Sequence, residues 1–116
     1  DALREFDESG RDRLFHGATA AIVIATRPGA SCPREDALLA AQNIALAAHA
    51  MGIGTCLIGF AVEAMRRDPS IQRALGVPAD EAVHAVIALG KPAVTYLRPA
   101  GRKPVPIRFA DLAGSP

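Results

Sequence analysis

A run of 26 residues without a charged side chain, from Ala37 to Val62, constrains this chain more than any other feature. Its first 15 residues continue a segment that begins at Pro33, which is well suited to the first turn of a helix. Gly52 supplies the residue type that most often ends a helix in a left-handed conformation. The sequence therefore predicts a helix from about Pro33 to Met51.

This predicted helix is apolar nearly all round, and a helix without a polar face must be buried on every side. The chain has 116 residues, and 24 of its 58 hydrophobic residues are Ala, whereas only five residues are Phe or Tyr. Alanine contributes little buried area, so we expect a thin core. Because so short a chain can hardly surround the helix, we infer that another chain covers part of it and that the protein is an oligomer.

The same run is long enough to span a bilayer. However, it contains Gln42, Asn43 and His49, and Gly52 and Gly54 interrupt it after its first 15 residues. The aromatic belts and the asymmetry of flanking basic residues that mark a membrane helix are missing. We therefore expect no membrane-spanning segment.

The remaining elements follow from shorter patterns. Short apolar runs bounded by turn residues predict strands. Asp68 followed by Pro69 is typical of a helix start. We expect a short helix before Gly10, a helix from about Val62, a helix from Asp68 to Gly76, and strands at Ala20–Thr26 (buried on both faces), Thr55–Phe60 (short and buried) and 82–90.

The C-terminal part changes character. Residues 91–108 hold four of the nine Pro residues, five basic residues and no acidic residue. Proline at this density prevents a helix or a central strand. We expect an extended arm, covering residues 92–116 of a chain that otherwise forms one domain over 1–116.

Charge and cysteine content exclude several classes of protein. The formal net charge is +1, which gives no reason to expect a nucleic-acid partner. Cys32 and Cys56 are 24 positions apart without a CxxC pair or a histidine cluster, so neither a disulfide framework nor a metal site is expected. No signal peptide is visible. A cytoplasmic protein is the resulting expectation.

Motifs for catalysis are equally scarce. The glycines from Gly52 to Gly59 follow a helix and precede a strand, the reverse of a dinucleotide-binding fingerprint. No Ser lies in a GxSxG elbow. His49 is interpreted as a packing residue of its helix rather than an acid or base. The basic Arg102-Lys103-Pro104 segment fits either a phosphate site or a solvated tail, and the strand Thr55–Phe60 either approaches a ligand or leads into a turn.

A series of motifs resembles the C-terminal half of the nitroreductase family. The series consists of Leu14-Phe15-His16-Gly17-Ala18, Glu35-Asp36 with Ala40 to Ala48, Met51-Gly52-Ile53-Gly54-Thr55-Cys56-Leu57-Ile58-Gly59, Ala88-Leu89-Gly90-Lys91-Pro92, Tyr96 and Arg102-Lys103-Pro104. It covers residues 14–104, and its order and spacing carry the resemblance more than any single motif.

The resemblance implies an α+β fold: a three-layer sandwich with a mixed, mostly antiparallel sheet flanked by helices, and an extended C-terminal arm. It implies an FMN-dependent oxidoreductase that works as a homodimer, with ping-pong hydride transfer from NAD(P)H to a nitroaromatic, quinone or similar acceptor. Gly59 would offer its N–H to the flavin N5, Ile58 would pack by the ring, and Arg102 and Lys103 would contact the FMN phosphate. No residue of the chain is expected to be catalytic by itself, because the cofactor carries the chemistry.

Two alternatives remain open at this point. The family's N-terminal half, with its own phosphate-binding motif, has no counterpart here, so the chain holds only part of a flavin site. It could therefore belong to a family member with another FMN reaction, such as dehalogenation. It could equally be a flavin-free dimerisation module, a degenerate member of the family.

Overall fold

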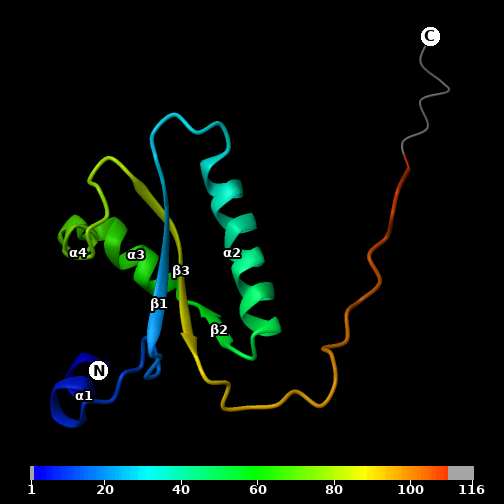
Figure 1. Ribbon diagram of the computed structural model, residues 1–116, viewed down its shortest axis with the longest axis horizontal. Coiled ribbons are helices and arrows are strands. Elements are labelled where there is room, and N and C mark those ends of the chain that lie inside the picture. The colour runs from blue at the N-terminus through cyan, green and yellow to red at the C-terminus, as the bar shows by residue number, and fades with distance from the viewer. Residues whose placement is uncertain (1, 110–116) are drawn as a thin grey trace.

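A three-stranded sheet lies at the centre of the computed structural model, which describes residues 2–109 (Figure 1). The strands are β1 (Ala20–Thr26), β2 (Gly54–Leu57) and β3 (Ala82–Gly90), in the order β1-β3-β2, and both pairings are antiparallel. The helices are α1 (Ala2–Ser9), α2 (Pro33–Ala50), α3 (Gly59–Arg67) and α4 (Pro69–Ala74).

The central strand β3 separates two small cores, because its side chains point alternately to opposite faces of the sheet. Val86 and Ala88 pack on one face with Met65 of α3. Ala85 and Ile87 pack on the other face in a cluster with Ala41. Helices α2 and α3 therefore lie on opposite faces of the sheet (Figure 1), and the expected α+β three-layer sandwich is confirmed.

The expected helix of the uncharged run is confirmed as α2, and its end is well defined. Gly52 has a φ of +73°. The N–H of Gly52 donates to the carbonyl of His49 (3.0 Å), and the N–H of Ile53 donates to the carbonyl of Ala48 (2.8 Å). This pair of bonds is the Schellman arrangement. Within residues 2–109, none of the helices has the length and apolar content needed to cross a membrane.

Two expectations about the strands are wrong in detail. Strand β1 has the predicted bounds, but its first three residues are exposed and the rest are only half-buried. Strand β2 ends at Leu57 rather than Phe60, and Thr55, Cys56 and Leu57 are exposed. The physical reason is the same for both: each lies at an edge of the described sheet, with β3 as its paired neighbour on one side. Helix α3 accordingly begins at Gly59, three residues before the expected start.

The core is as thin as the composition predicts. Six of the ten buried hydrophobic residues among the described ones are Ala. The chain exposes 9888 Å², whereas a compact monomer of this mass exposes about 6000 Å². The extended arm and one uncovered side of α2 both contribute to this excess. Leu39 and Leu46 of α2 are 65% and 59% exposed, and Met51, just after the helix, is 73% exposed. The single chain thus does not cover α2 on every side, as expected for so short a chain, and the predicted cover by a second chain stays a prediction.

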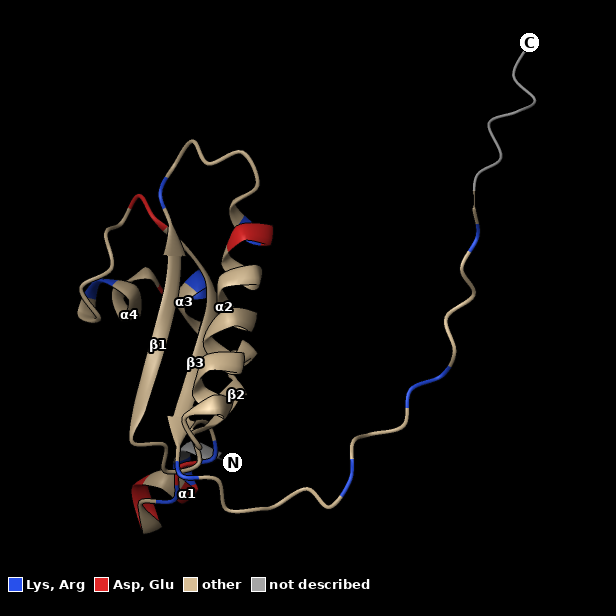
Figure 2. Cartoon of the chain, turned by 45° about the vertical axis from the view of Figure 1, so that its right-hand side comes forward, with Lys and Arg blue, Asp and Glu red and all other residues tan. Residues whose placement is uncertain are grey.

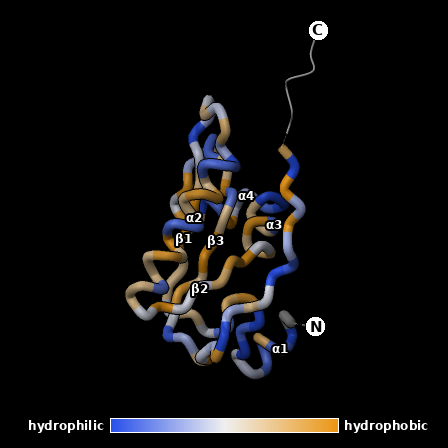
Figure 3. Tube along the Cα trace, turned by 90° about the vertical axis from the view of Figure 1, so that its right-hand side faces the viewer, coloured by the Kyte–Doolittle hydropathy of each residue, from blue (hydrophilic) through white to orange (hydrophobic). Residues whose placement is uncertain are grey.

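The expected arm is extended as far as the structure describes it. Residues 91–109 contain no helix or strand, and all of them are exposed. The arm leads away from the sheet, carries Lys and Arg without acidic residues, and alternates between apolar and polar stretches (Figures 1, 2 and 3). Because of the arm, the radius of gyration is 19.1 Å, against about 13 Å for a compact domain of this length. Residues 110–116 of the expected arm lie outside the described residues.

Candidate functional site

The junction between β2 and α3 holds two of the residues singled out in the sequence. Ile58 is 7% exposed and packs in the core with Ala61 and Val86, and its N–H donates to the carbonyl of Val86 (2.8 Å). Gly59 is the first residue of α3, so its N–H has no acceptor within the helix. A Cβ built on Gly59 meets nothing within 4 Å. The junction therefore presents one N–H donor at a fixed place beside open space.

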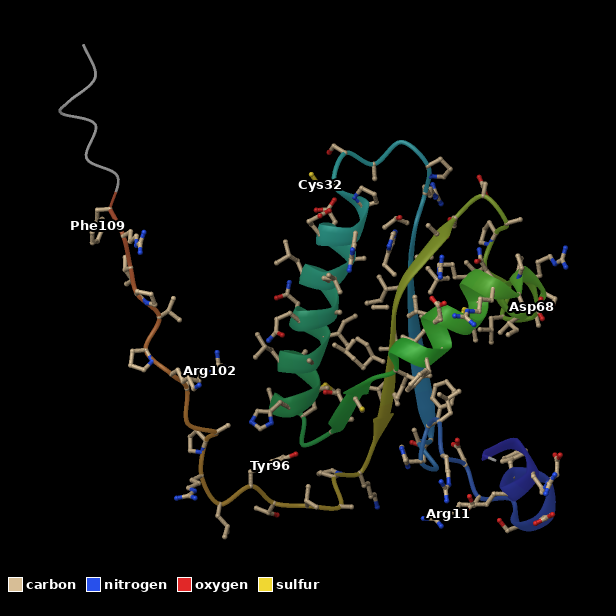
Figure 4. All side chains as sticks on the ribbon, turned by 180° about the vertical axis from the view of Figure 1, so that it is seen from behind. Arg11, Cys32, Asp68, Tyr96, Arg102 and Phe109 are labelled. Atoms are coloured by element: carbon tan, nitrogen blue, oxygen red, sulfur yellow. The ribbon has the colours of Figure 1, made fainter. Side chains whose placement is uncertain are left out.

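Arg102 and Lys103 lie far along the arm. Both are exposed, and among the described residues neither forms a hydrogen bond or an ion pair. Figure 4 shows Arg102 on the arm, well away from α3. The structure of the single chain therefore does not bring the two basic residues together with Ile58 and Gly59.

A cavity of about 1000 Å³ lies at one end of the sheet, where β3 runs into the arm. Its walls come from the loop 15–19, the α2–β2 turn with His49, residues 88–90 of β3 and the first residues of the arm, and it is open to solvent. The arm is held close here, because a Cβ on Gly54 would come within 3.3 Å of the Cα of Pro92. Ile58, Gly59, Arg102 and Lys103 do not line this cavity.

His49 has a different place from the expected one. It is exposed on the last turn of α2 and lines the cavity, so within the single chain it is not the packing residue that was expected. The reason is that the side of α2 facing the sheet is occupied by Ala41 and Ala48. His84 does have a structural place on the sheet: its Nε2 lies 2.9 Å from the Oγ1 of Thr26 on the neighbouring strand.

The loop before β1 is organised by Asp12. Its carboxylate accepts the backbone N–H groups of Leu14 (2.8 Å), Phe15 (2.8 Å) and Gly17 (3.2 Å). These bonds, led by those from Phe15 and Gly17, lower the pKa of the Asp12 carboxyl. His16 within this loop has a φ of +53°, a conformation that few residues other than glycine adopt. The loop thus holds the His16 backbone in an uncommon conformation at the cavity wall.

We expect Asp12→Ala to release this loop while leaving the sheet intact. The N–H groups of Leu14, Phe15 and Gly17 lose their acceptor, so their hydrogen exchange should speed up in an NMR measurement. Because the pKa of Asp12 is lowered in the folded state, its ionised carboxylate stabilises the fold at pH values above the ordinary pKa range of an aspartate carboxyl. This stabilisation is lost as the pH falls through the lowered pKa of Asp12.

Asp7→Ala on α1 is the matched control, since the same charge is removed from an exposed position. Equal exchange rates in the two variants would show that the three hydrogen bonds do not hold the loop.

The sequence did not reveal the cavity. Its lining comes from three separate stretches of sequence, and the left-handed conformation of His16 has no signal in the sequence except the neighbouring Gly17. Among the described residues, no group of three or more His, Cys, Asp or Glu could hold a metal ion. The lack of a polar face in the predicted helix indicated that α2 needs more cover than this chain supplies. It did not indicate which side of α2 is exposed.

Comparisons with known proteins address the fold and the family. The sequence pattern of the nitroreductase family matches residues 2–91. The structure is similar to that of a nitroreductase with bound FMN from Bacteroides fragilis NCTC 9343, with a TM-score of 0.71 and 26% identity over 94% of this chain. It is also similar to a nitroreductase with bound FMN from Desulfitobacterium hafniense DCB-2, with a TM-score of 0.66 and 29% identity over 86% of this chain.

An FMN-dependent nitroreductase from Clostridium difficile R20291 shares the fold, with a TM-score of 0.60 at 22% identity. The chain spans 60% of the length of the Bacteroides protein and 54% of the Desulfitobacterium protein. No curated protein matches the chain significantly. The family pattern covers well over half of the residues, and the chain belongs to the nitroreductase family.

Proposed function

We propose that this chain forms part of an FMN-dependent oxidoreductase that transfers hydride from NAD(P)H to a nitroaromatic, quinone or similar acceptor. When bound, FMN supplies the hydride chemistry, in two successive half-reactions. The observation that carries this proposal is family membership, together with two structures of similar fold, 26% and 29% identical, that hold FMN.

We propose that the β2–α3 junction contacts the flat ring of a flavin. We assign to the N–H of Gly59 a hydrogen bond to the flavin N5. This assignment is supported by the position of Gly59 at the start of α3, where the N–H has no intrahelical acceptor and the adjoining space is open. The N–H of Ile58 is already bound to Val86. Ile58 therefore contributes by anchoring the junction in the core, beside the ring.

Arg102 and Lys103 are assigned to the phosphate of FMN. Their side chains carry charges that suit a phosphate, and charge-assisted hydrogen bonds to phosphate are strong. Since both lie on the outstretched arm, we propose that the arm is seated against a second copy of the chain and that the protein is a homodimer. The uncovered apolar half of α2 supports this assembly, because a second copy would bury it.

We expect the double variant Arg102→Ala, Lys103→Ala to bind FMN at least about tenfold more weakly, since each lost hydrogen bond to a charged group is worth about 1.5–3 kcal/mol. Titration of FMN into the protein, followed by quenching of flavin fluorescence, measures this. Arg98→Ala, Arg108→Ala is the matched control, because it removes two charges from the same arm. If both double variants bind FMN alike, the phosphate assignment is wrong.

A second candidate is a flavin-free dimerisation module. It is favoured by the separation of the two predicted halves of the site in the single chain and by the length of the chain relative to similar structures. The two candidates differ in one measurable property: the module would form a stable dimer but would not retain FMN at any concentration tested.

The cellular compartment and the domain organisation are also part of this proposal. We place it in the cytoplasm, which is supported by two free and exposed cysteines, Cys32 and Cys56. We treat residues 1–116 as belonging to a single domain, with 92–116 as its arm.

A further inference from the structure

We propose that the cavity at the end of the sheet is a binding site for a small-molecule oxyanion, either a phosphate or a carboxylate. The proposal goes beyond flavin binding, because none of the four residues assigned to FMN lines this cavity. Its volume of about 1000 Å³ is at the upper end of the range of small-molecule sites.

The charges of the lining favour an anion. Lys91 lines the cavity, and no Asp or Glu does; the imidazoles of His16 and His49 add N–H donors. Asp12 lies in the adjoining loop, but three backbone N–H groups already bind its carboxylate. The positive charge of Lys91 is therefore not neutralised within the cavity, and no carboxylate of the lining repels an anion.

Neutral donors lie on the same walls. Thr55 on β2 and Tyr96 on the arm line the cavity, and their hydroxyl groups make no hydrogen bond within residues 2–109. Figure 4 shows Tyr96 below the turn that joins α2 to β2. Residues that carry hydroxyl, imidazole and ammonium groups thus line one open cavity, and these groups are suited to donate to the oxygens of a phosphate or carboxylate.

The walls are held in place by the backbone. Asp12 fixes the loop that contains His16, and the left-handed conformation of His16 is kept although it is unfavourable for a residue with a Cβ. On the opposite side, the close approach of Gly54 to Pro92 holds the first residues of the arm against β2. Lys91 is adjacent to this contact. The backbone segments that carry the donors are therefore in place before any ligand arrives, whereas the exposed side chains are ordered when the ligand binds.

The direct test is titration of the intact, flavin-free chain with inorganic phosphate, followed by NMR at constant ionic strength. We expect saturable shifts of the imidazole signals of His16 and His49 and of the backbone amides of residues 15–19 and 91–96. A parallel titration with acetate distinguishes the two sources of the oxyanion: stronger binding of one probe identifies it as the preferred class. Absence of saturable shifts with both probes overturns the proposal.

Two variants test the assignment of the donors. Lys91→Gln removes the ammonium group, and His16→Gly removes the imidazole while a glycine accepts the positive φ. Each is expected to weaken binding of the preferred probe by about fivefold or more, as loss of a charge-assisted hydrogen bond implies. Arg73→Gln on α4 is the control, because it removes the same charge from an exposed position outside the cavity, and its affinity should match the wild type.

If Lys91→Gln, His16→Gly and Arg73→Gln bind the preferred probe with equal affinity, the proposal is overturned, even where the wild type shows saturable NMR shifts. If the loop is disturbed in His16→Gly, Lys91→Gln alone still decides. Because no flavin is present in these experiments, failure to bind FMN and failure to bind the oxyanion are separate results.

Discussion

Leu46→Lys is expected to dissociate the proposed homodimer without unfolding the chain. Leu46 lies in the C-terminal half of α2, in the uncharged run, and is 59% exposed in the single chain. If a second copy covers this side of α2, the lysine places an unpaired charge in a buried interface, which costs about 3–5 kcal/mol. The dissociation constant of the dimer should therefore rise about 100-fold or more.

Analytical ultracentrifugation over a range of concentrations measures this constant. Lysine is a good helix former, so α2 itself should persist, as circular dichroism would verify. Leu75→Lys is the matched control: Leu75 is 55% exposed, at the end of α4 and outside the uncharged run. A Leu46→Lys protein that dimerises as well as Leu75→Lys would place the interface elsewhere.

Ile87→Ala is expected to have the largest effect on the stability of the fold. Ile87 is 1% exposed at the centre of β3, and it packs against Ala41 and Ile44 of α2 and Ile24 of β1. Truncation leaves a cavity that the neighbouring alanine cannot fill. The cost for such a change is about 2–5 kcal/mol, which is a large part of the about 5–15 kcal/mol that stabilises a typical domain.

Urea denaturation monitored by circular dichroism measures the loss. Ile22→Ala is the control, because Ile22 is the register partner of Ile87 on β1 but is 36% exposed. Its cost should be about 1 kcal/mol, in the range of ordinary partly exposed positions. If the two variants lose equal stability, β3 does not provide the core that joins the sheet to α2.

The parts of the fold set by local sequence were predictable. Pro33 and Gly52 bracket α2 because their backbone preferences act within a turn. The apolar run 82–90 became β3 with the predicted bounds because it is covered on both faces.

The errors arose where burial depends on neighbours. Both β1 and β2 contain apolar residues suited to a covered strand, yet each lies at an edge of the described sheet. A pattern of residues indicates what a segment is fitted to bury, not whether the same chain supplies the cover. The exposed side of α2 has the same explanation: the sequence indicates a surface fitted to be covered, and the partner that would cover it stays a prediction.

The candidate site was predictable only through the resemblance of its motifs. Gly59 was singled out by its place in a family-like series, and the structure then placed it at the first residue of α3, three residues earlier than the helix start expected from the sequence. The cavity with His16, His49 and Lys91 had no such series, because its residues come from segments far apart in the sequence.

The most direct test of the central claim is the mass of the purified chain in solution, measured by light scattering together with its visible absorbance after addition of FMN and removal of the excess. The account predicts a particle of twice the 12.1 kDa of one chain that retains the visible bands of an oxidised flavin. A particle of 12.1 kDa that retains no FMN would contradict both the homodimer and the flavin site.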